Sequence, residues 1–322
     1  MTFRLSVLLC IAPLAVFAQD GDTADRIASS GAAELPDATQ LLLDGYEIPE
    51  MEGDDEFGEI RVIERVTNWM PWSLSAYGGA TRTDNAALSS DGLEESDTYF
   101  RSGARLAYVP AIKGNLFANF GVTQEFFRYD EFSFLNFDYL IATGGLFYTP
   151  QPNGGWLDPF IQDLSVFGNY NYYRITTDDL QEEIFTNHTL SFGVQKQTPI
   201  RRGHRLYYGA VLEPSLEGNP TVGQRDEYRW FGGYIIEWTP KLSTSFTYTG
   251  SYFDYEEGDR EDLNHYLALG QMLTLWQGYN GDIAWNSYVN VEMAYTINES
   301  NTDLRDYESF TWGAQLGLRL SF

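Results

Sequence analysis

Acid–base chemistry in this chain would have to use one of its three histidines, which are His188, His204 and His265. A hydrolase needs such a side chain beside a hydroxyl, a carboxylate or a bound water. In "NHTLS", an extended strand places Ser191 on the face opposite His188, so these two cannot pair within one strand. Spacing alone leaves open a protease site built on carboxylates at the rim, for instance Asp262 with His265, whereas no GxSxG or HExxH string occurs. The sequence therefore favours a protein that is not an enzyme and needs no cofactor, with a lipase or protease as an alternative.

Carboxylates are the second group with chemical potential, because Ca²⁺ and Mg²⁺ prefer oxygen ligands. They gather in short runs such as "TTDDLQEE" from residue 176 and "YEEGDRED" from residue 255. No run has the spacing of an EF-hand loop, so we expect solvated loops that attract cations, with divalent cations as candidate partners. The net charge of -26 argues against a nucleic-acid partner, since phosphate backbones bind cationic surfaces.

The end of the chain indicates which kind of element must hold these residues. In "WGAQLGLRLSF" (312–322) every second residue is apolar, from Trp312 to Phe322. A period of two is typical of a β-strand with one apolar and one polar face. Aromatic residues make up 16% of the chain, and aromatic residues are strong strand formers. These features predict an all-β protein.

From about residue 70 the alternation continues in twelve segments, which we predict to be antiparallel strands. Their connections alternate between short turns with Pro or Gly, such as "TPK" at 239, and longer acidic loops. An even number of strands joined in this way is the organisation of a transmembrane up-and-down β-barrel. The predicted strands are 72–82, 98–109, 115–128, 136–149, 160–175, 184–197, 204–213, 227–239, 242–254, 263–276, 282–296 and 308–322.

A soluble β-sandwich, for example in an exported adhesin, would show the same period, so three further features separate the two classes. The segments are longer than the strands of about five or six residues usual in soluble sheets, but they match tilted transmembrane strands. Tyr and Trp gather near both ends of the segments, with Trp72 and Trp285 beside short turns, as lipid headgroup regions select. The terminal Phe322 fits a last strand that pairs with the first and leaves no open edge.

If the apolar face contacts lipid, the ionisable residues of the opposite face line the lumen. The predicted lumen-lining residues are Arg101, Arg105, Glu125, Asp163, Arg205, Glu213, Arg229, Glu237, Glu292 and Arg319. Five are basic and five are acidic, which is too even to predict ion selectivity. A barrel of about twelve strands is intermediate between small filled barrels and wide porins, so a polar pore and a closed structural barrel are both compatible with this set.

The segment "AQLGLRLSF" resembles the last strand of Gram-negative outer-membrane β-barrel proteins, which ends in Phe after alternating apolar residues. The stretch "SAYGGATRTDNAALSSDGLEESDTYFRSGARLAY" (75–108) is also similar to the opening hairpin of β-barrel porins. The resemblance implies contact with outer-membrane lipid and recognition of the last strand by the barrel-assembly machinery. It covers residues 70–322 and assigns no named porin. The residues of the implied assembly signal are Leu316, Leu318, Leu320 and Phe322.

The start of the chain, "MTFRLSVLLCIAPLAVFAQD", has a basic residue, an apolar run and small residues before Gln19, which predicts a cleaved signal peptide at 1–18. The single cysteine lies inside it, so no disulfide is expected in the mature chain. Residues 19–66 hold 14 acidic and 3 basic residues and are predicted to be a disordered periplasmic segment. Docking on a partner or entry into the barrel as a plug is an alternative for this segment. The predicted barrel occupies residues 67–322.

Together these patterns predict a Gram-negative outer-membrane β-barrel that forms a porin-like channel for small hydrophilic solutes. The alternatives are a closed structural barrel without a continuous pore and a barrel enzyme of the lipase or protease type. Which of them holds depends on how the inner side chains pack.

Overall fold

The computed structural model describes residues 70–89, 94–152, 155–178, 180, 182–280, 283–302 and 305–322. The predicted signal peptide and the acidic segment lie outside the described residues. Within the described ranges all long elements are β-strands. No helix in this part of the chain is long and apolar enough to cross a membrane.

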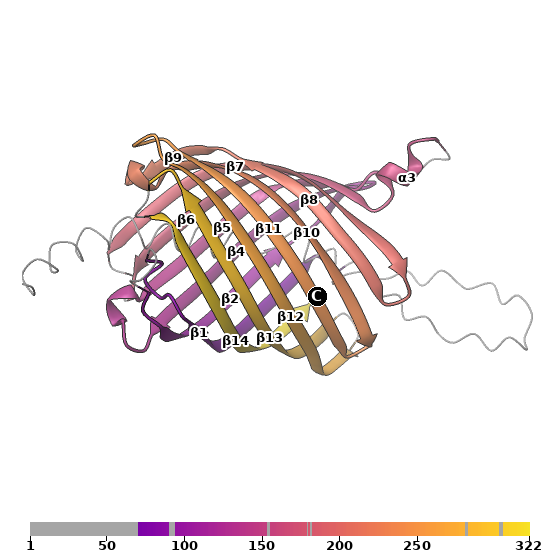
Figure 1. Cartoon of the computed structure of the whole chain (residues 1–322). Helices are drawn as coiled ribbons and strands as arrows, with labels where there is room; N and C mark the ends of the chain where they lie inside the picture. The colour runs from indigo at the N-terminus through magenta and orange to yellow at the C-terminus, as the bar shows by residue number, and fades with distance from the viewer. Residues whose placement is uncertain are drawn as a thin grey trace, which may run out of the picture.

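The strands form one antiparallel sheet that closes into a barrel (Figure 1). In the described part of the chain, twelve long strands follow each other around the barrel in sequence order, and two short strands, β3 (Ala111–Lys113) and β9 (Ser215–Asn219), are added to it. The pairing of β14 with β1 confirms the predicted closure. The twelve long strands confirm the predicted number. The long strands are β1 (Trp72–Thr83), β2 (Asp97–Tyr108), β4 (Leu116–Tyr129), β5 (Phe137–Tyr148), β6 (Leu164–Thr177), β7 (Glu183–Arg201), β8 (His204–Glu213), β10 (Arg225–Thr239), β11 (Leu242–Tyr255), β12 (Glu261–Asn280), β13 (Ile283–Ser300) and β14 (Tyr307–Ser321).

The seam between the first and last strands extends to the final residue. Backbone hydrogen bonds of 3.0 Å run from Trp72 N to Phe322 O and from Phe322 N to Trp72 O. The two aromatic rings stack with their centroids 6.4 Å apart. Since an unpaired strand would leave an open edge, this pairing keeps the seam closed as far as Phe322.

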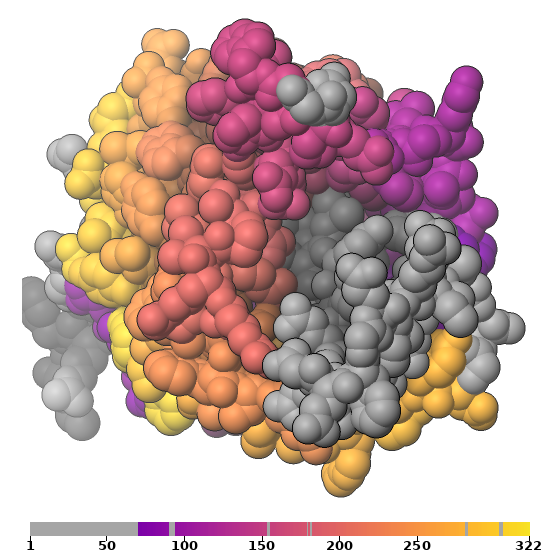
Figure 2. Space-filling model, turned by 90° about the vertical axis from the view of Figure 1, so that its right-hand side faces the viewer, coloured from indigo at the N-terminus to yellow at the C-terminus, as the bar shows by residue number. Residues whose placement is uncertain are grey.

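The connections are sorted to the two ends of the barrel, as predicted. Figure 1 shows tight turns and α3 (Asp158–Ile161) at one end, and the loops with η1 (Ser133–Leu135) and η2 (Thr221–Gly223) at the other. We call these the short-turn end and the loop end. Figure 2 faces the short-turn end, where the segment that carries α3 projects from the rim in magenta.

The outer face of the barrel is apolar. On β14 the outward side chains of Trp312, Leu316 and Leu318 are 52%, 56% and 45% exposed. The alternate residues Gln315 and Arg319 point inward and line a cavity. Hydrocarbon is the solvent that suits such a surface, because water would oppose so many exposed apolar side chains.

Aromatic rings inside the barrel pack over glycines of the neighbouring strand. Phe167 of β6 lies over Gly193 of β7, where an added Cβ would be 2.1 Å from the ring. Tyr207 of β8 lies over Gly233 of β10, where the corresponding distance is 2.2 Å. Any side chain at these two glycines would displace the ring, so the close approach of the ring requires glycine.

Candidate functional site in the barrel interior

A cavity of about 1510 Å³ lies inside the barrel. At the short-turn end it is lined by Lys241 and Tyr279, and at the loop end by Thr83, Leu88 and Tyr129. One continuous space is therefore lined by residues from both ends of the barrel.

The cavity follows one side of the barrel, which we call the open half. Small polar residues such as Ser75 of β1, Thr247 of β11 and Asn290 of β13 line it there. No residue of β6 or β7, both of which are fully described, lines the cavity. Its other wall is apolar and aromatic and includes Phe117, Phe127, Phe137, Ile141, Phe147, Tyr207 and Ile235.

The remaining interior, which we call the filled half, is packed with side chains. One buried apolar cluster contains Val109, Phe147, Phe167, Tyr207, Val211 and Phe231. A second cluster contains Phe127, Phe137, Tyr139, Ile175 and Phe185. The interior thus combines an open half with a filled half. This arrangement is intermediate between the two alternatives that the sequence allowed, a polar pore and a closed structural barrel.

A buried polar network braces the filled half between β6 and β11. Glu213 accepts hydrogen bonds from Tyr173 and Thr189, both at 2.7 Å. Arg229 donates to Glu227 at 2.6 Å and lies 3.9 Å from Glu213. None of these three charged side chains lines the cavity. Arg229 thus compensates both carboxylates in part within the packed interior, where an unpaired charge would be costly.

Arg101 and Glu125 form a second ion pair, on the wall made by β2 and β4. Arg101 Nη2 is 2.5 Å from Glu125 Oε1, and the Tyr77 hydroxyl of β1 donates to the same carboxylate. The Glu125 side chain is only 4% exposed, whereas Arg101 and Tyr77 line the cavity. The cavity therefore contacts the guanidinium, and the carboxylate lies behind it.

Arg105 and Arg319 lie on the two strands that flank Ser75. In the sheet register Ser75 pairs with Arg105 of β2 on one side and with Arg319 of β14 on the other. All three residues line the cavity. Neighbouring strands are about 4.8 Å apart, so the backbones of the two arginines are separated by roughly 10 Å. We call Arg105, Ser75 and Arg319 the arginine rung.

The other predicted lumen residues divide between the cavity and the outside. Arg205 pairs with Glu237, and both line the cavity. Glu292 also lines it and accepts a hydrogen bond from a tyrosine hydroxyl at 3.0 Å. Asp163 lies instead in the turn before β6, with an exposed side chain and a φ of 57°. Its expected inward position assumed a strand from residue 160, but α3 continues to Ile161 and β6 begins at Leu164.

Sequence reasoning missed inward charged residues near the loop end. Glu227 has an inward position on a predicted strand, so the alternation alone could have identified it. Arg225 and Asp262 lie just before the predicted strands 227–239 and 263–276, and the observed strands begin earlier. These strands extend further toward the loop end than predicted because hydrogen bonding between strands continues beyond the lipid-facing apolar residues. The alternation of apolar and polar residues, on which the prediction depended, ends with those residues.

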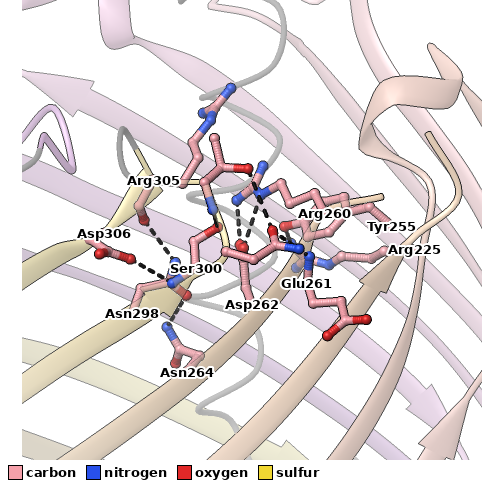
Figure 3. A network of polar contacts seen from close by, with 12 residues as sticks. Arg225, Tyr255, Arg260, Glu261, Asp262, Asn264, Asn298, Ser300, Arg305 and Asp306 are labelled. Carbon is pink, nitrogen blue, oxygen red and sulfur yellow. Dashed lines mark hydrogen bonds and ion pairs between the residues drawn. The ribbon is translucent and has the colours of Figure 1, made fainter. Parts of the chain in front are cut away.

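Polar contacts hold the loops together above these residues (Figure 3). Arg260 donates to Asp262 at 3.0 Å, and Asn264 donates to Asn298 at 3.2 Å. Asn298 in turn donates to the Arg305 carbonyl at 2.9 Å, and burial lowers the pKa of the Arg305 guanidinium. Among the described residues no group of three or more His, Cys, Asp or Glu is arranged to hold a metal ion. Divalent-cation binding by the acidic loops stays a prediction.

The histidines show no catalytic arrangement. The side chains of Asp262 and His265 lie on opposite faces of β12. Asp262 is buried and pairs with Arg260, whereas His265 contacts the Tyr248 hydroxyl at 2.9 Å. The geometry therefore removes the hydrolytic pair that the spacing left open. Each histidine pairs through Nδ1 with a tyrosine hydroxyl of a neighbouring strand: His188 with Tyr170 at 2.5 Å, His204 with Tyr234 at 2.9 Å, and His265 with Tyr248 at 2.9 Å.

Comparison with known proteins agrees with this fold. The chain matches no protein-family model and no curated protein. It is similar in structure to an outer membrane channel from Pseudomonas putida F1, with a TM-score of 0.52, 8% identity, and coverage of 81% of this chain and 100% of that chain. The beta domain of the Bordetella autotransporter BrkA has a TM-score of 0.41, 12% identity, and coverage of 78% and 100%. The KdgM porin in complex with oligogalacturonate has a TM-score of 0.36, 10% identity, and coverage of 77% and 99%. At these identities the likeness shows the fold, a barrel of the outer-membrane type.

Proposed function

We propose that this protein is a porin-like channel of a Gram-negative outer membrane, through which small hydrophilic solutes diffuse. One observation carries the proposal: a single cavity is lined by residues from both ends of the barrel. Its open half presents hydroxyl and amide groups, while the outer face is apolar. A barrel with these two faces provides a path for water and polar solutes through hydrocarbon.

The two halves of the interior have different roles in this proposal. Apolar clusters and buried ion pairs hold the filled half together, so the wall of the open half keeps its shape without a solute. Outer-membrane lipid contacts the outward leucines. The last strand, with Leu316, Leu318, Leu320 and Phe322, serves as the signal for the barrel-assembly machinery.

Single cysteines test the path, because the only natural cysteine lies in the predicted signal peptide. Ser75→Cys places a thiol in the cavity, Ala76→Cys places one on the lipid face of the same strand, and Ser191→Cys places one in the filled half, where Ser191 is 4% exposed. In planar bilayers the protein should show discrete conductance steps. A charged methanethiosulfonate reagent should reduce the step size of Ser75→Cys and leave the other two unchanged.

Two results would contradict the proposal. The first is a correctly folded barrel, shown by a heat-dependent shift on SDS gels, that never conducts. The second is a conductance that the reagent reduces equally in all three variants.

A further inference from the structure

The segment that carries α3 exposes large apolar side chains at the short-turn end of the barrel (Figure 1). Trp156 is 82% exposed, the highest value among the large apolar side chains in the described part of the chain, and Phe160 is 66% exposed. Leu157, which lies between them in the sequence, is 45% exposed. Contiguous apolar side chains of this size on a surface mark a contact with a protein or a membrane.

Local hydrogen bonds give these side chains a common direction. Asp158 N donates to Gly155 O at 3.2 Å, and Ile161 N donates to Leu157 O at 3.1 Å. The backbone therefore turns helically from the residue before Trp156 to the end of α3. Residues four apart in such a turn lie on the same side, which places Trp156 beside Phe160.

The barrel holds this segment against its outer wall. Lys196 Nζ of β7 donates to the carbonyls of Pro159 at 2.5 Å and Phe160 at 3.3 Å. The alternation of β7 places Lys196 on the outward face with Val194, and its register partner Tyr208 of β8 also points outward and is 45% exposed. No residue of α3, which is fully described, lines the cavity. The apolar side chains therefore lie outside the lumen.

Lipid is the neighbour that suits the wall to which α3 is tied. Val166 of β6 and Val194 are outward and 45% and 41% exposed, and Trp238 at the same end of the barrel is 59% exposed. The short turns of outer-membrane barrels lie on the periplasmic side, where the headgroup region selects aromatic residues. A lysine can lay its apolar stem along such a wall and keep its ammonium group at the interface. The surface of α3 is thus continuous with the lipid-facing surface of the barrel.

We propose that Trp156, Leu157 and Phe160 form an interfacial anchor that inserts into the headgroup region of the periplasmic leaflet and contacts phospholipid there. Apolar Trp, Phe and Leu side chains on one face are the pattern by which short helical segments lie in the plane of a membrane interface. The anchor extends the lipid contact of the barrel beyond its strands, at the β5–β6 connection. This inference goes beyond the proposed channel function, since it depends on the membrane position of the barrel and not on conductance.

A bimane label on a single cysteine tests the position of the anchor in the full chain. Phe160→Cys carries the label and keeps Trp156 and Leu157. Val166→Cys is the lipid reference, and Ser75→Cys in the cavity is the aqueous reference. In vesicles of phosphatidylethanolamine and phosphatidylglycerol, a lipid with a nitroxide near its headgroup should quench the label of Phe160→Cys severalfold more than that of Ser75→Cys. Aqueous iodide should quench the two labels in the opposite order.

Substitutions within the segment test the cause of the contact. Trp156→Ser/Leu157→Ser, added to Phe160→Cys, should lower the quenching by the nitroxide lipid severalfold. Gln162→Ser is the matched control, because Gln162 is an exposed polar residue just after α3, and it should leave the quenching unchanged. A heat-dependent shift on SDS gels shows that each variant is folded.

Two results would overturn the anchor. The first is strong iodide quenching of Phe160→Cys with lipid quenching no higher than that of Ser75→Cys, which would place these side chains in water and favour a protein partner. The second is lipid quenching that the double serine substitution leaves unchanged, because the contact would then not depend on the apolar side chains. Neither readout uses conductance, so a failed anchor leaves the proposed channel standing.

Discussion

Replacement of Arg229 by methionine should destabilise the barrel far more than the same replacement of Arg205. The two arginines each pair with a glutamate, but in different surroundings. Arg229, Glu227 and Glu213 have side chains that are 12%, 11% and 9% exposed. Arg205 and Glu237 are 26% and 31% exposed and lie beside the cavity. The two sites therefore differ in burial and in the number of carboxylates that the arginine faces.

The magnitude follows from the geometry. Arg229 lies 2.6 Å from Glu227 and 3.9 Å from Glu213, and two unit charges about 4 Å apart interact by about 4 kcal/mol at an effective dielectric constant of 20. Loss of one partner from a buried ion pair costs about 3–5 kcal/mol, which is roughly a hundredfold to a few thousandfold in the unfolding equilibrium. Solvent screens the pair of Arg205, so its loss should cost about 1 kcal/mol or less.

Guanidinium unfolding in lipid vesicles, followed by tryptophan fluorescence and by mobility on SDS gels, measures the two free energies of unfolding. The triple variant Arg229→Met/Glu213→Gln/Glu227→Gln should recover part of the loss, because it removes the two carboxylates that Arg229→Met leaves unpaired. Equal losses for Arg229→Met and Arg205→Met would refute the reasoning, and so would a triple variant that is less stable than Arg229→Met.

Two further predictions concern packing and the lipid face. Gly193→Ala should cost about 1–3 kcal/mol in the same unfolding assay, because its Cβ would meet the Phe167 ring at 2.1 Å. Gly232→Ala, whose nearest contact is 3.7 Å away, should be close to neutral, and an equal loss would contradict the packing described here. Leu318→Lys should cost about 2–4 kcal/mol by placing a charge in hydrocarbon, whereas Gln315→Lys faces the cavity and should be tolerated. If both lysines reduce the folded fraction on an SDS gel equally, the assignment of the two faces is incorrect.

The strands could be predicted because their information is local. Side chains alternate between faces by position alone, so the inward direction of Arg105 and Arg319 follows from the sequence of each strand. The segment 204–213 was predicted with the bounds that β8 has, and 242–254 differs from β11 by one residue. Errors fell where the apolar alternation stops, as at Asp163, because pairing there depends on the neighbouring strand and not on the local pattern.

The sequence by itself determined an all-β chain, the order and approximate position of its long strands, the face of the side chains within the alternating segments, and a last strand with an apolar outer face. Tertiary structure alone decided which inward groups meet the cavity. Glu125 and Glu213 have the same inward direction as Arg105, yet contacts with Arg101 and with side chains of β6 and β7 bury both acids. The partners in these contacts are 24 to 42 residues apart in the chain, and no single strand's pattern contains them. Which inward groups are buried therefore depends on neighbours that closure of the barrel brings together.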